Sequence, residues 1–343
     1  MKAVPLKNRS VRRILCVRSD RLGEFLLTLP ALQLLKMNYP NAKISLIAQQ
    51  QNLELVRGVP WIDHEIPVEM LPKSSWRLAQ ALRKYSFDMA VVFNPQKEFH
   101  RALFLAGIPL RVGYNQKNGF LLNHNRLHTQ KFDHKHEIDQ NIALAALVCS
   151  SLGVPSPDLP WNERGEIEAL LQKALILDKA PFIVIHPFTS DVSKALPFAF
   201  WNKLIRHWTS QGRNLLIIGQ ASEYSDSEFS RICNPRVFSI AGKLTLRQVG
   251  ALLKYYCRFY TGLDSGPYHM ASMLGLPLAV IFRKPEMIPL WGPYFGKEKA
   301  KVVLSQEGCD KVTEQEVLRA FSDFAEVEGS THQDDGSDEQ YHS

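Results

Sequence analysis

Short runs of apolar, largely β-branched residues alternate with helical patterns along most of the chain, and this alternation restricts the fold more than any other feature. Nine such runs are ILCV (14–17), KISLIA (43–48), HEIPV (64–68), DMAVVF (88–93), FIVIHPF (182–188), NLLIIG (214–219), VFSIAG (237–242), RFYTGLD (258–264) and PLAVIF (277–282). The first run leads into a helix that we expect from about Glu24 to Asn38. Strands that alternate with helices predict parallel sheets with helices on both faces.

The rhythm is interrupted once, at GVPSPDLPW (153–161), where three prolines end a helical stretch. A length of 343 residues is sufficient for two domains. We therefore expect an α/β chain of two doubly wound, Rossmann-like domains, 1–160 and 175–325, that face each other across a cleft. In such sheets ligands bind outside the carboxyl ends of the strands. The acidic segment 326–343 is polar and is expected to be a disordered tail.

Composition limits the class of protein and its partners. The net charge is +7, and it becomes +13 when the six acids of the tail, which has no Lys or Arg, are set aside. This favours an anionic partner such as a phosphorylated sugar, a nucleic acid or a membrane surface, without choosing among them. Five scattered cysteines without a CxxC pair indicate reduced, mostly buried thiols. No run approaches the ~18 to 20 apolar residues of a membrane helix, and no secretory signal is recognisable, so we expect a cytoplasmic protein.

The stretch TGLDSGPYHMASMLGLP (261–277) has the strongest functional signal. A strand ends, Asp264, Ser265 and Gly266 form a turn, and Pro267 suits the first turn of a helix. The free N–H groups of that helix start would bind an anion, and His269 lies on the first turn, where it could contact the same anion. A capped turn with an incidental histidine remains the alternative.

The stretch HPFTSDVSKALP (186–197) also follows a strand. Thr189 and Ser190 offer hydroxyl groups, and Lys194 offers a point charge suited to phosphate. The alternative is a solvated loop with one lysine. Because both loops follow strands of the second half, we expect them to flank one site.

The stretch RSDRLGEFLLTLPAL (18–32) places Glu24 at the start of a leucine-rich helix. An acid there is favoured by about 0.3 to 1 kcal/mol through the helix dipole alone, so Glu24 is explained without chemistry. Asp20, four residues earlier, competes with it for any catalytic assignment.

Taken together, these stretches resemble glycosyltransferase family 9, the ADP-heptose lipopolysaccharide heptosyltransferases. The opening is similar to the family's Arg-x-Asp/Ser-x-x-Gly-Asp segment, which precedes a helix with Thr-x-Pro-Ala-Leu. LFLAGIPLRVGY (103–114) resembles its Ala-Gly-x-x-x-Arg-x-Gly segment, and HEIDQNIALAALVCSSLGV (136–154) the helix that closes its first domain. SKALPFAFWNKL (193–204) resembles its Lys-x-Trp-Pro loop, and residues 261–282 its Asp-Ser/Thr-Gly-x-x-His signature.

The resemblance implies a GT-B fold, with an N-terminal acceptor domain and a C-terminal domain for the nucleotide sugar. It implies inverting, metal-independent transfer of heptose from ADP-heptose to a lipopolysaccharide inner-core hydroxyl. Glu24 takes the position of the family's general base, and Lys194 would stabilise the leaving ADP. The positions that match the donor site are Thr189, Ser190, Lys194, Asp264, Ser265, Gly266 and His269. Candidates for the acceptor side are Asp20, Lys97, His100, Arg101, Arg111, Lys117 and Arg126.

No Asp-x-Asp pair lies at a strand end, so neither a metal nor another cofactor is expected, and the ADP-sugar is a co-substrate. The expected partners are this nucleotide sugar and the lipopolysaccharide acceptor, with peripheral contact at the inner face of the inner membrane. No GxGxxG follows a strand, which disfavours a dehydrogenase, and no motif supports nucleic-acid binding.

Two positions depart from the family pattern. Glu24 stands where Asp is usual, and Leu196 stands where Trp is usual. Free Asp and Glu differ in pKa by only about 0.4, so the change affects reach more than basicity. Leu196 could alter the contacts to the donor. A transferase for another nucleotide sugar, and a nucleotide-binding relative without activity, therefore remain alternatives.

Overall fold

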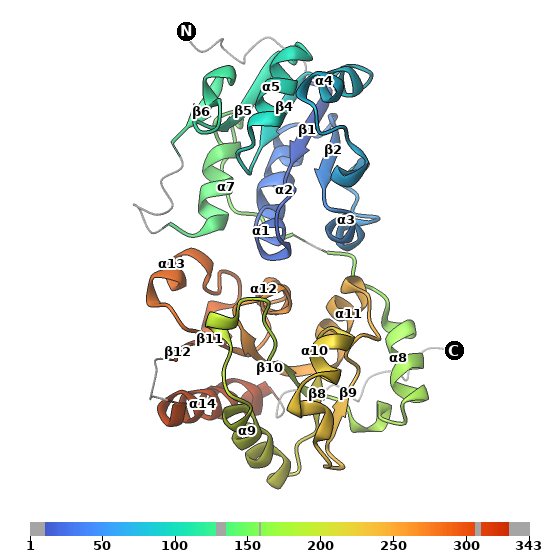
Figure 1. Ribbon diagram of the computed structural model, residues 1–343, viewed down its shortest axis with the longest axis vertical. Helices are drawn as coiled ribbons and strands as arrows, with labels where there is room; N and C mark the ends of the chain where they lie inside the picture. Colours follow the sequence, from blue (N-terminus) through green and yellow to red (C-terminus); the bar gives the residue numbers. More distant parts are fainter. Residues whose placement is uncertain (1–10, 128–134, 158, 306–309, 329–343) are drawn as a thin grey trace, which may run out of the picture. The chain divides into compact units, whose positions relative to one another are not determined.

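The computed structural model describes residues 11–127, 135–157, 159–305 and 310–328. The chain divides into two compact α/β units (Figure 1). The first comprises Met1–Pro160 with Pro289–Trp291, and the second comprises Trp161–Ile288 with Gly292–Ser343. The two Rossmann-like domains expected from the alternation of strands and helices are confirmed.

The first unit is built on a six-stranded sheet whose neighbouring strands are all parallel, in the order β3-β2-β1-β4-β5-β6. Its strands are β1 (Arg13–Val17), β2 (Lys43–Ala48), β3 (His64–Pro67), β4 (Met89–Val92), β5 (Leu110–Tyr114) and β6 (His124–Arg126). The chain order reverses between β1 and β4. The carboxyl ends of these two strands are therefore the switch point at which such sheets bind ligands.

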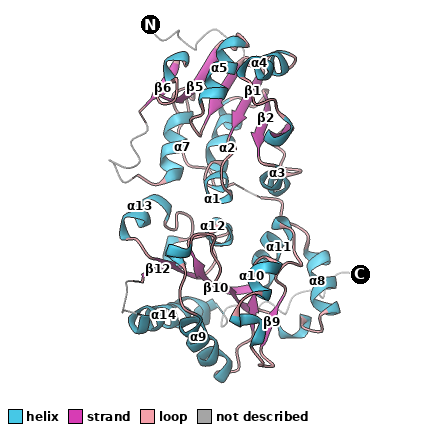
Figure 2. Cartoon of the chain, in the orientation of Figure 1, coloured by secondary structure: helices cyan, strands magenta, loops and turns pink. Residues whose placement is uncertain are grey.

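Helices cover both faces of this sheet (Figure 2). They are α1 (Leu22–Leu26), α2 (Leu29–Asn38), α3 (Gln50–Val56), α4 (Ser75–Arg83), α5 (Lys97–Leu105) and α7 (Glu137–Ala145). The apolar sides of α4 and α5 pack on alternate strand residues such as Leu15, Val17 and Val92. Helix α2 packs with α7.

The single helix predicted from Glu24 to Asn38 is wrong, because the chain forms two helices, α1 and α2, with a break at Leu27 and Thr28. Pro30 lies in the first turn of α2, where its missing N–H is tolerated, whereas inside a continuous helix it would remove a hydrogen bond. The Thr28 hydroxyl donates to the backbone oxygen of Glu24 at 2.8 Å. Because the helix breaks after Leu26, Glu24 lies on a helix of only five residues, α1.

The second unit repeats the same topology in the order β12-β11-β10-β7-β8-β9, again with parallel neighbours. Its strands are β7 (Phe182–His186), β8 (Leu215–Ile217), β9 (Val237–Ser239), β10 (Cys257–Leu263), β11 (Leu278–Phe282) and β12 (Ala300–Leu304). Its switch point lies between β7 and β10. Of its strands, β12 was not predicted, and the same is true of β5 and β6 in the first unit.

Helices of the second unit are α8 (Arg164–Lys173), α9 (Phe198–Ser210), α10 (Ala221–Ser225), α11 (Leu246–Tyr256), α12 (Gly266–Met273) and α14 (Asp310–Glu328), and α13 (Ile288–Trp291) spans the boundary in sequence. The core on one face joins α9 and α14 through Trp208 and Phe321, whose ring centroids are 5.7 Å apart. Helix α14 includes the first three residues of the predicted tail, and 329–343 lie outside the described residues.

The prediction that most cysteines are buried is wrong for the described ones. Cys16 is buried, Cys149 and Cys257 are partly exposed, and Cys233 is exposed. All four are free thiols, and Cys309 lies outside the described residues.

Candidate active site

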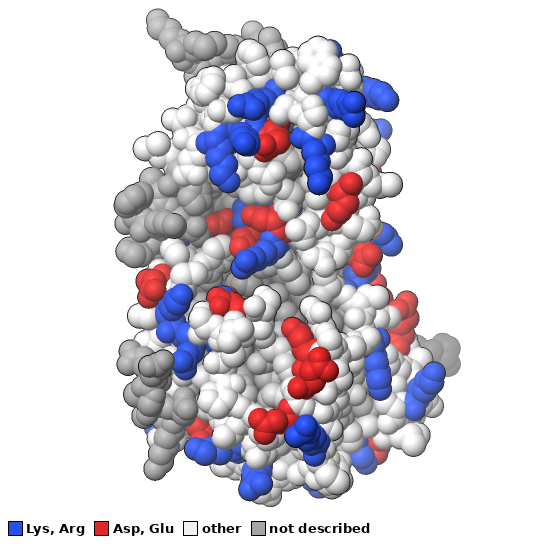
Figure 3. Space-filling view, in the orientation of Figure 1, with Lys and Arg blue, Asp and Glu red and all other residues white. Residues whose placement is uncertain are grey.

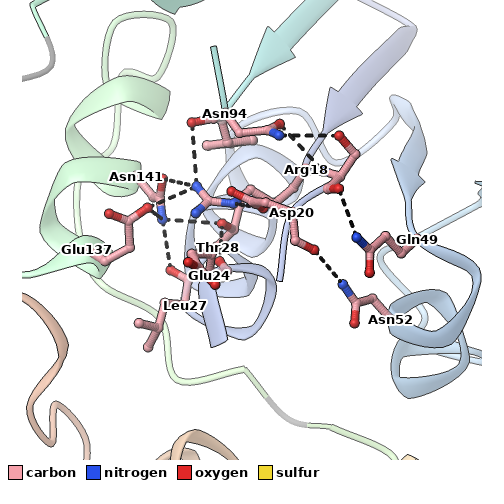
Figure 4. A network of polar contacts seen from close by, with 12 residues as sticks. Arg18, Asp20, Glu24, Leu27, Thr28, Gln49, Asn52, Asn94, Glu137 and Asn141 are labelled. Atoms are coloured by element: carbon pink, nitrogen blue, oxygen red, sulfur yellow. Dashed lines mark hydrogen bonds and ion pairs between the residues drawn. The ribbon is translucent and has the colours of Figure 1, made fainter. Parts of the chain in front are cut away.

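A buried ion-pair network occupies the switch point of the first unit, directly after β1 (Figure 4). Arg18, only 3% exposed, places its Nε 2.7 Å from Asp20 Oδ1 and its Nη1 2.9 Å from Glu137 Oε1. The same Nη1 donates to Asn141 Oδ1 at 3.3 Å. Glu137 and Asn141 are one turn apart on α7, so this helix presents two polar side chains to the end of β1.

The network joins one guanidinium to two carboxylates, and burial acts on all three groups. Burial raises the pKa of the Asp20 carboxyl, Arg18 opposes that shift, and the nearby charge of Glu24 adds to it. Burial also raises the pKa of Glu137 against the effect of Arg18. For Arg18, burial opposes the charge, but Glu137 and Asp20 raise its pKa above the usual value. Arg18 is therefore the cation around which these carboxylates are arranged.

Amide side chains hold the loop that follows β1. They come from the segments that follow the two neighbouring strands: Asn52 lies on α3, after β2, and Gln96 precedes α5, after β4. Gln96 Nε2 donates to Ser19 Oγ at 2.7 Å, and Asn52 Nδ2 donates to the backbone oxygen of Asp20 at 3.1 Å. Three parallel strands thus contribute to one polar cluster, as expected at a switch point.

Glu24 differs from Asp20 in its surroundings. Its carboxylate is partly exposed on the first turn of α1, and no described residue makes a hydrogen bond or an ion pair with it. The Asp20 carboxylate, by contrast, is bound by Arg18. Of the two acids, Glu24 is the one whose oxygens are open to a ligand.

The basic acceptor-side candidates differ in exposure and in their partners. Lys97 and Arg101 are exposed on α5. Arg111 donates to the backbone oxygens of Ile108 at 2.6 Å and Leu121 at 2.8 Å, so its guanidinium already has partners. The proposal that His100 contributes to an exposed acceptor surface is wrong, because this residue is fully buried. Of the other two, Lys117 is exposed and Arg126 is partly exposed.

In the second unit, Lys194, Asp264 and His269 lie together at the switch point between β7 and β10. Lys194 Nζ is 2.6 Å from Asp264 Oδ2, and His269 Nε2 is 3.4 Å from Asp264 Oδ1. Burial opposes the charge of Asp264, but its contacts with His269 and Lys194 hold the pKa of that carboxyl below its usual range. The expectation that the two loops meet at one place is therefore correct for these three residues.

The helix start at Ser265 and Gly266 lies beside this cluster. Ser265 is the N-cap of α12, and its Oγ lies 3.1 Å from Nδ1 of His186, the last residue of β7. The first N–H groups of a helix have no partner within it, which makes them donors for an anion. Burial lowers the pKa of His186 to about 4, so this histidine is neutral at pH 7.

This shift predicts a pH dependence of stability. An unfolded histidine takes up a proton near pH 6.5, whereas His186 in the folded chain does so only near pH 4. Between these values the unfolded state binds more protons, so stability falls as the pH falls. We expect wild-type protein to lose on the order of 2 kcal/mol more than His186→Asn between pH 6.5 and 4.5. Urea unfolding followed by tryptophan fluorescence measures the free energy of unfolding at each pH. An equal fall of this free energy with pH in the two proteins would contradict the prediction.

The other residues of the predicted donor loop have local roles. Thr189 Oγ1 accepts from the backbone N–H of Asp191 at 3.2 Å, and Ser190 is exposed. Leu196, at the position where the family has Trp, is 8% exposed in the core that includes Phe200.

Several polar residues at the two switch points were not predicted. They follow strands or lie on α7, and they are Arg18, Gln49, Asn52, Asn94, Gln96, Glu137, Asn141 and His186. Position after a strand could have indicated most of them. The spacing of four residues between Glu137 and Asn141 could have indicated that the two side chains share one face of a helix.

The described residues show neither a metal-binding cluster nor a membrane-spanning helix. No group of three or more His, Cys, Asp or Glu side chains among them is arranged to hold a metal ion. Likewise, none of the helices in the described ranges has the length and apolar character of a membrane span.

A family model, curated relatives and a solved structure all indicate the same family for this chain. The model of glycosyltransferase family 9 (heptosyltransferase) matches residues 75–319. Lipopolysaccharide heptosyltransferase 3 of Escherichia coli is 23% identical over 295 residues, covering 79% of this chain and 83% of the relative. Lipopolysaccharide heptosyltransferase 2 of Salmonella typhimurium is 23% identical over 336 residues, covering 90% and 92%. The structure of the E. coli ADP-heptose lps heptosyltransferase II matches with a TM-score of 0.77 at 22% identity, covering 92% of this chain and 99% of that one.

Proposed function

The chain belongs to glycosyltransferase family 9, and from this premise we propose that it transfers heptose from ADP-heptose to a hydroxyl of the lipopolysaccharide inner core, with inversion. The observation that carries the proposal is the family match over residues 75–319, to which the named heptosyltransferases add support. The two switch points supply the groups that such a transfer needs: an accessible carboxylate in one unit and a cation beside a helix start in the other.

In the proposed step Glu24 is the general base. The acceptor oxygen forms a bond to the anomeric carbon, the bond from that carbon to the ADP oxygen breaks, and ADP leaves with the electron pair. Glu24 takes the proton of the acceptor hydroxyl. Asp20 is the weaker candidate because Arg18 binds its carboxylate at 2.7 Å, whereas no described residue binds that of Glu24.

The donor diphosphate is proposed to bind at Lys194 and the start of α12. A lysine ammonium has three donors, and the two recorded contacts of Lys194 Nζ are both with Asp264. The remaining donor and the free N–H groups at the helix start would hold phosphate oxygens, while neutral His186 orients Ser265. Fixed positive charge there stabilises the negative charge that develops on the leaving ADP, without a metal in the proposed step. Thr189, Ser190 and His269 complete the proposed donor site.

A transferase that uses another nucleotide sugar is the second candidate, and Leu196 at the family's Trp position is the observation that favours it. A panel of ADP-heptose, other ADP-sugars and UDP-sugars, each assayed for binding and for transfer, separates the two. The proposal expects turnover with ADP-heptose alone or far above the others. Preference for another sugar by tenfold or more in kcat/KM would replace it, and nucleotide binding without any turnover would indicate a non-catalytic relative.

Because the proposed acceptor is linked to a lipid, we propose that the reaction takes place at the cytoplasmic face of the inner membrane. One surface of the first unit suits contact with an anionic bilayer. Helices α4 and α5 pack together, and α5 contacts the turn at 119–121. Residues 71–111 carry seven Lys or Arg and only two acids. Figure 3 shows Lys and Arg side chains gathered over α4 and α5. We call this the basic aromatic surface and define it by the exposed residues Trp76, Arg77, Arg83, Arg101, Phe104, Lys117 and Phe120.

The aromatic residues favour a membrane over a nucleic acid as the partner of this surface. Trp76 is 54%, Phe104 51% and Phe120 77% exposed, and grouped apolar side chains of this kind mark interaction surfaces. Aromatic rings beside basic groups are typical of surfaces that lie in the headgroup region of a bilayer.

We expect the chain to bind vesicles that contain phosphatidylglycerol and to be released by salt. Arg77→Glu reverses one charge on the basic aromatic surface and should weaken binding about 5- to 30-fold, since each basic residue contributes roughly 1 kcal/mol near an anionic surface. Lys301→Glu, on β12 of the second unit, is the charge-matched control. Sedimentation with vesicles measures both variants. Equal binding by wild type, Arg77→Glu and Lys301→Glu would show that this surface is not the contact.

A further inference from the structure

Helix α7 contacts the C-terminal end of the short helix that carries Glu24. Asn141 Nδ2 donates to the backbone oxygen of Leu27, the C-cap of α1, at 3.2 Å, and to Thr28 Oγ1 at 3.3 Å. Thr28 Oγ1 in turn donates to the backbone oxygen of Glu24 at 2.8 Å. Only one hydroxyl group therefore separates the side chain of Asn141 from the backbone of Glu24 (Figure 4).

The same face of α7 holds the segment that enters α1. Arg18 joins Glu137 and Asn141 on α7 to Asp20, which lies two residues before the start of α1. The two ends of α1 are thus tied to a single pair of side chains, Glu137 and Asn141, which lie one helical turn apart. Asn141 Nδ2 also lies 3.3 Å from Glu137 Oε1, so one of its two N–H groups is shared between acceptors and joins the two ties.

Helix α1 needs these ties to have a defined orientation. A helix of five residues has little stability of its own in water, so its direction is set by what surrounds it. The residues that hold it are buried: Thr28 and Asn141 are 0%, Arg18 is 3% and Glu137 is 4% exposed. Apolar residues at such positions often give equal or greater stability, so stability alone does not explain the network. What a satisfied buried network adds is a single, rigid geometry.

We propose that Asn141 is a positioning residue for the transfer reaction, and that with Glu137 and Arg18 it fixes the backbone of Glu24 so that its carboxylate meets the acceptor hydroxyl. This inference rests on the proposed role of Glu24 as the base. It assigns a catalytic purpose to α7, a helix that does not itself carry a group for the reaction. Misplacement of a reacting group by about 1 Å costs up to 100-fold in rate, so a loosened α1 should be visible in kcat.

The test compares two asparagines of the first unit that make similar bonds. Asn38 donates to the backbone oxygens of Leu34 and Ser151 at 2.9 and 3.1 Å and accepts from the N–H groups of Ser150 and Ser151. It therefore ties α2 to the segment after α7, and these four hydrogen bonds do not involve α1. Asn38→Ala and Asn141→Ala each remove a side chain that bonds to the backbone, and both should lower the melting temperature. At a temperature where both are fully folded, Asn141→Ala should lower kcat about 10- to 100-fold with the donor KM unchanged, and Asn38→Ala should keep the wild-type kcat.

Thr28→Val is the second variant, because it keeps the shape of the side chain while removing the hydroxyl between Asn141 and Glu24. Thr28→Val should also lower kcat, and it tests the inference if Asn141→Ala fails to fold. Wild-type kcat in Thr28→Val or in folded Asn141→Ala, or an equal fall in Asn38→Ala, would overturn the inference. If Glu24→Gln is inactive in the same assays, such a result rejects only the positioning role. If Glu24→Gln is active, the proposed base itself is wrong.

Discussion

The Glu24→Gln variant is expected to lose about 10²- to 10⁴-fold in kcat for heptosyl transfer, the usual contribution of a general base. Gln has the shape of Glu but cannot accept the proton of the acceptor hydroxyl. Because no described residue binds the Glu24 carboxylate, its neutralisation breaks no ion pair, and ADP binding should remain unchanged. Initial rates of transfer, isothermal titration with ADP and a melting curve measure the three quantities.

The control for this variant is Glu166→Gln, which neutralises a first-turn acid of another helix, α8. Gln248 Nε2 donates to Glu166 Oε2 at 2.7 Å, and the amide oxygen of a glutamine can accept the same bond. An acid on the first turn is worth about 0.3 to 1 kcal/mol to its helix, so both variants should show a similar small loss of stability. A Glu24→Gln enzyme that is destabilised but active would mean that Glu24 only stabilises its helix as a first-turn acid. Glu24→Asp, which restores the family's usual residue, should retain more activity than Glu24→Gln.

Removal of the lysine at the second switch point is expected to act on the donor. Lys194→Ala should raise the Kd for ADP and the KM for ADP-heptose about 10- to 100-fold, the range expected for losing one charge-assisted hydrogen bond to phosphate. It should also leave the Asp264 carboxylate, whose side chain is 9% exposed, with His269 Nε2 as its remaining close partner at 3.4 Å. The acceptor KM should change little, because Lys194 lies in the unit proposed to bind the donor.

Lys203→Ala provides the control for Lys194→Ala. It removes another lysine of the second unit that pairs with an acid, Glu314, at 3.5 Å, outside the donor loop. The control should leave ADP affinity at the wild-type value. Equal ADP affinities in Lys194→Ala, Lys203→Ala and wild type would remove Lys194 from the phosphate site and make its pair with Asp264 a structural one.

The sequence predicted the parts of the fold that depend on local pattern. Strands β1, β7 and β10 are runs of buried apolar residues, and the polar residues after them had to lie at the carboxyl edge of a parallel sheet. The meeting of Lys194 with Asp264 was predictable on this basis. Strand β6 has three residues, none of them strongly apolar, and its place depends on pairing with β5, which no local pattern indicates.

The parts of the site that were missed depend on contacts between distant residues. Asn141 lies 113 residues from Thr28 in the chain, and only the packing of α7 against α2 brings them together. Pro30 was a signal for the break between α1 and α2. The leucines on both sides of it continued the helical pattern, and the sequence therefore predicted one helix. Arg18 looked like one of many basic residues, whereas its burial between Asp20 and Glu137 makes it the centre of the network.

The most direct test of the proposed function is a single reaction of purified full-length protein with ADP-heptose and an inner-core acceptor that lacks the heptose. Mass spectrometry and NMR of the product report whether a heptose was added and in which anomeric configuration. We expect one added heptose per acceptor, one ADP released per heptose, and a linkage inverted relative to the donor, all absent with Glu24→Gln. Retention of the donor configuration, or the same product from Glu24→Gln at the wild-type rate, would contradict it.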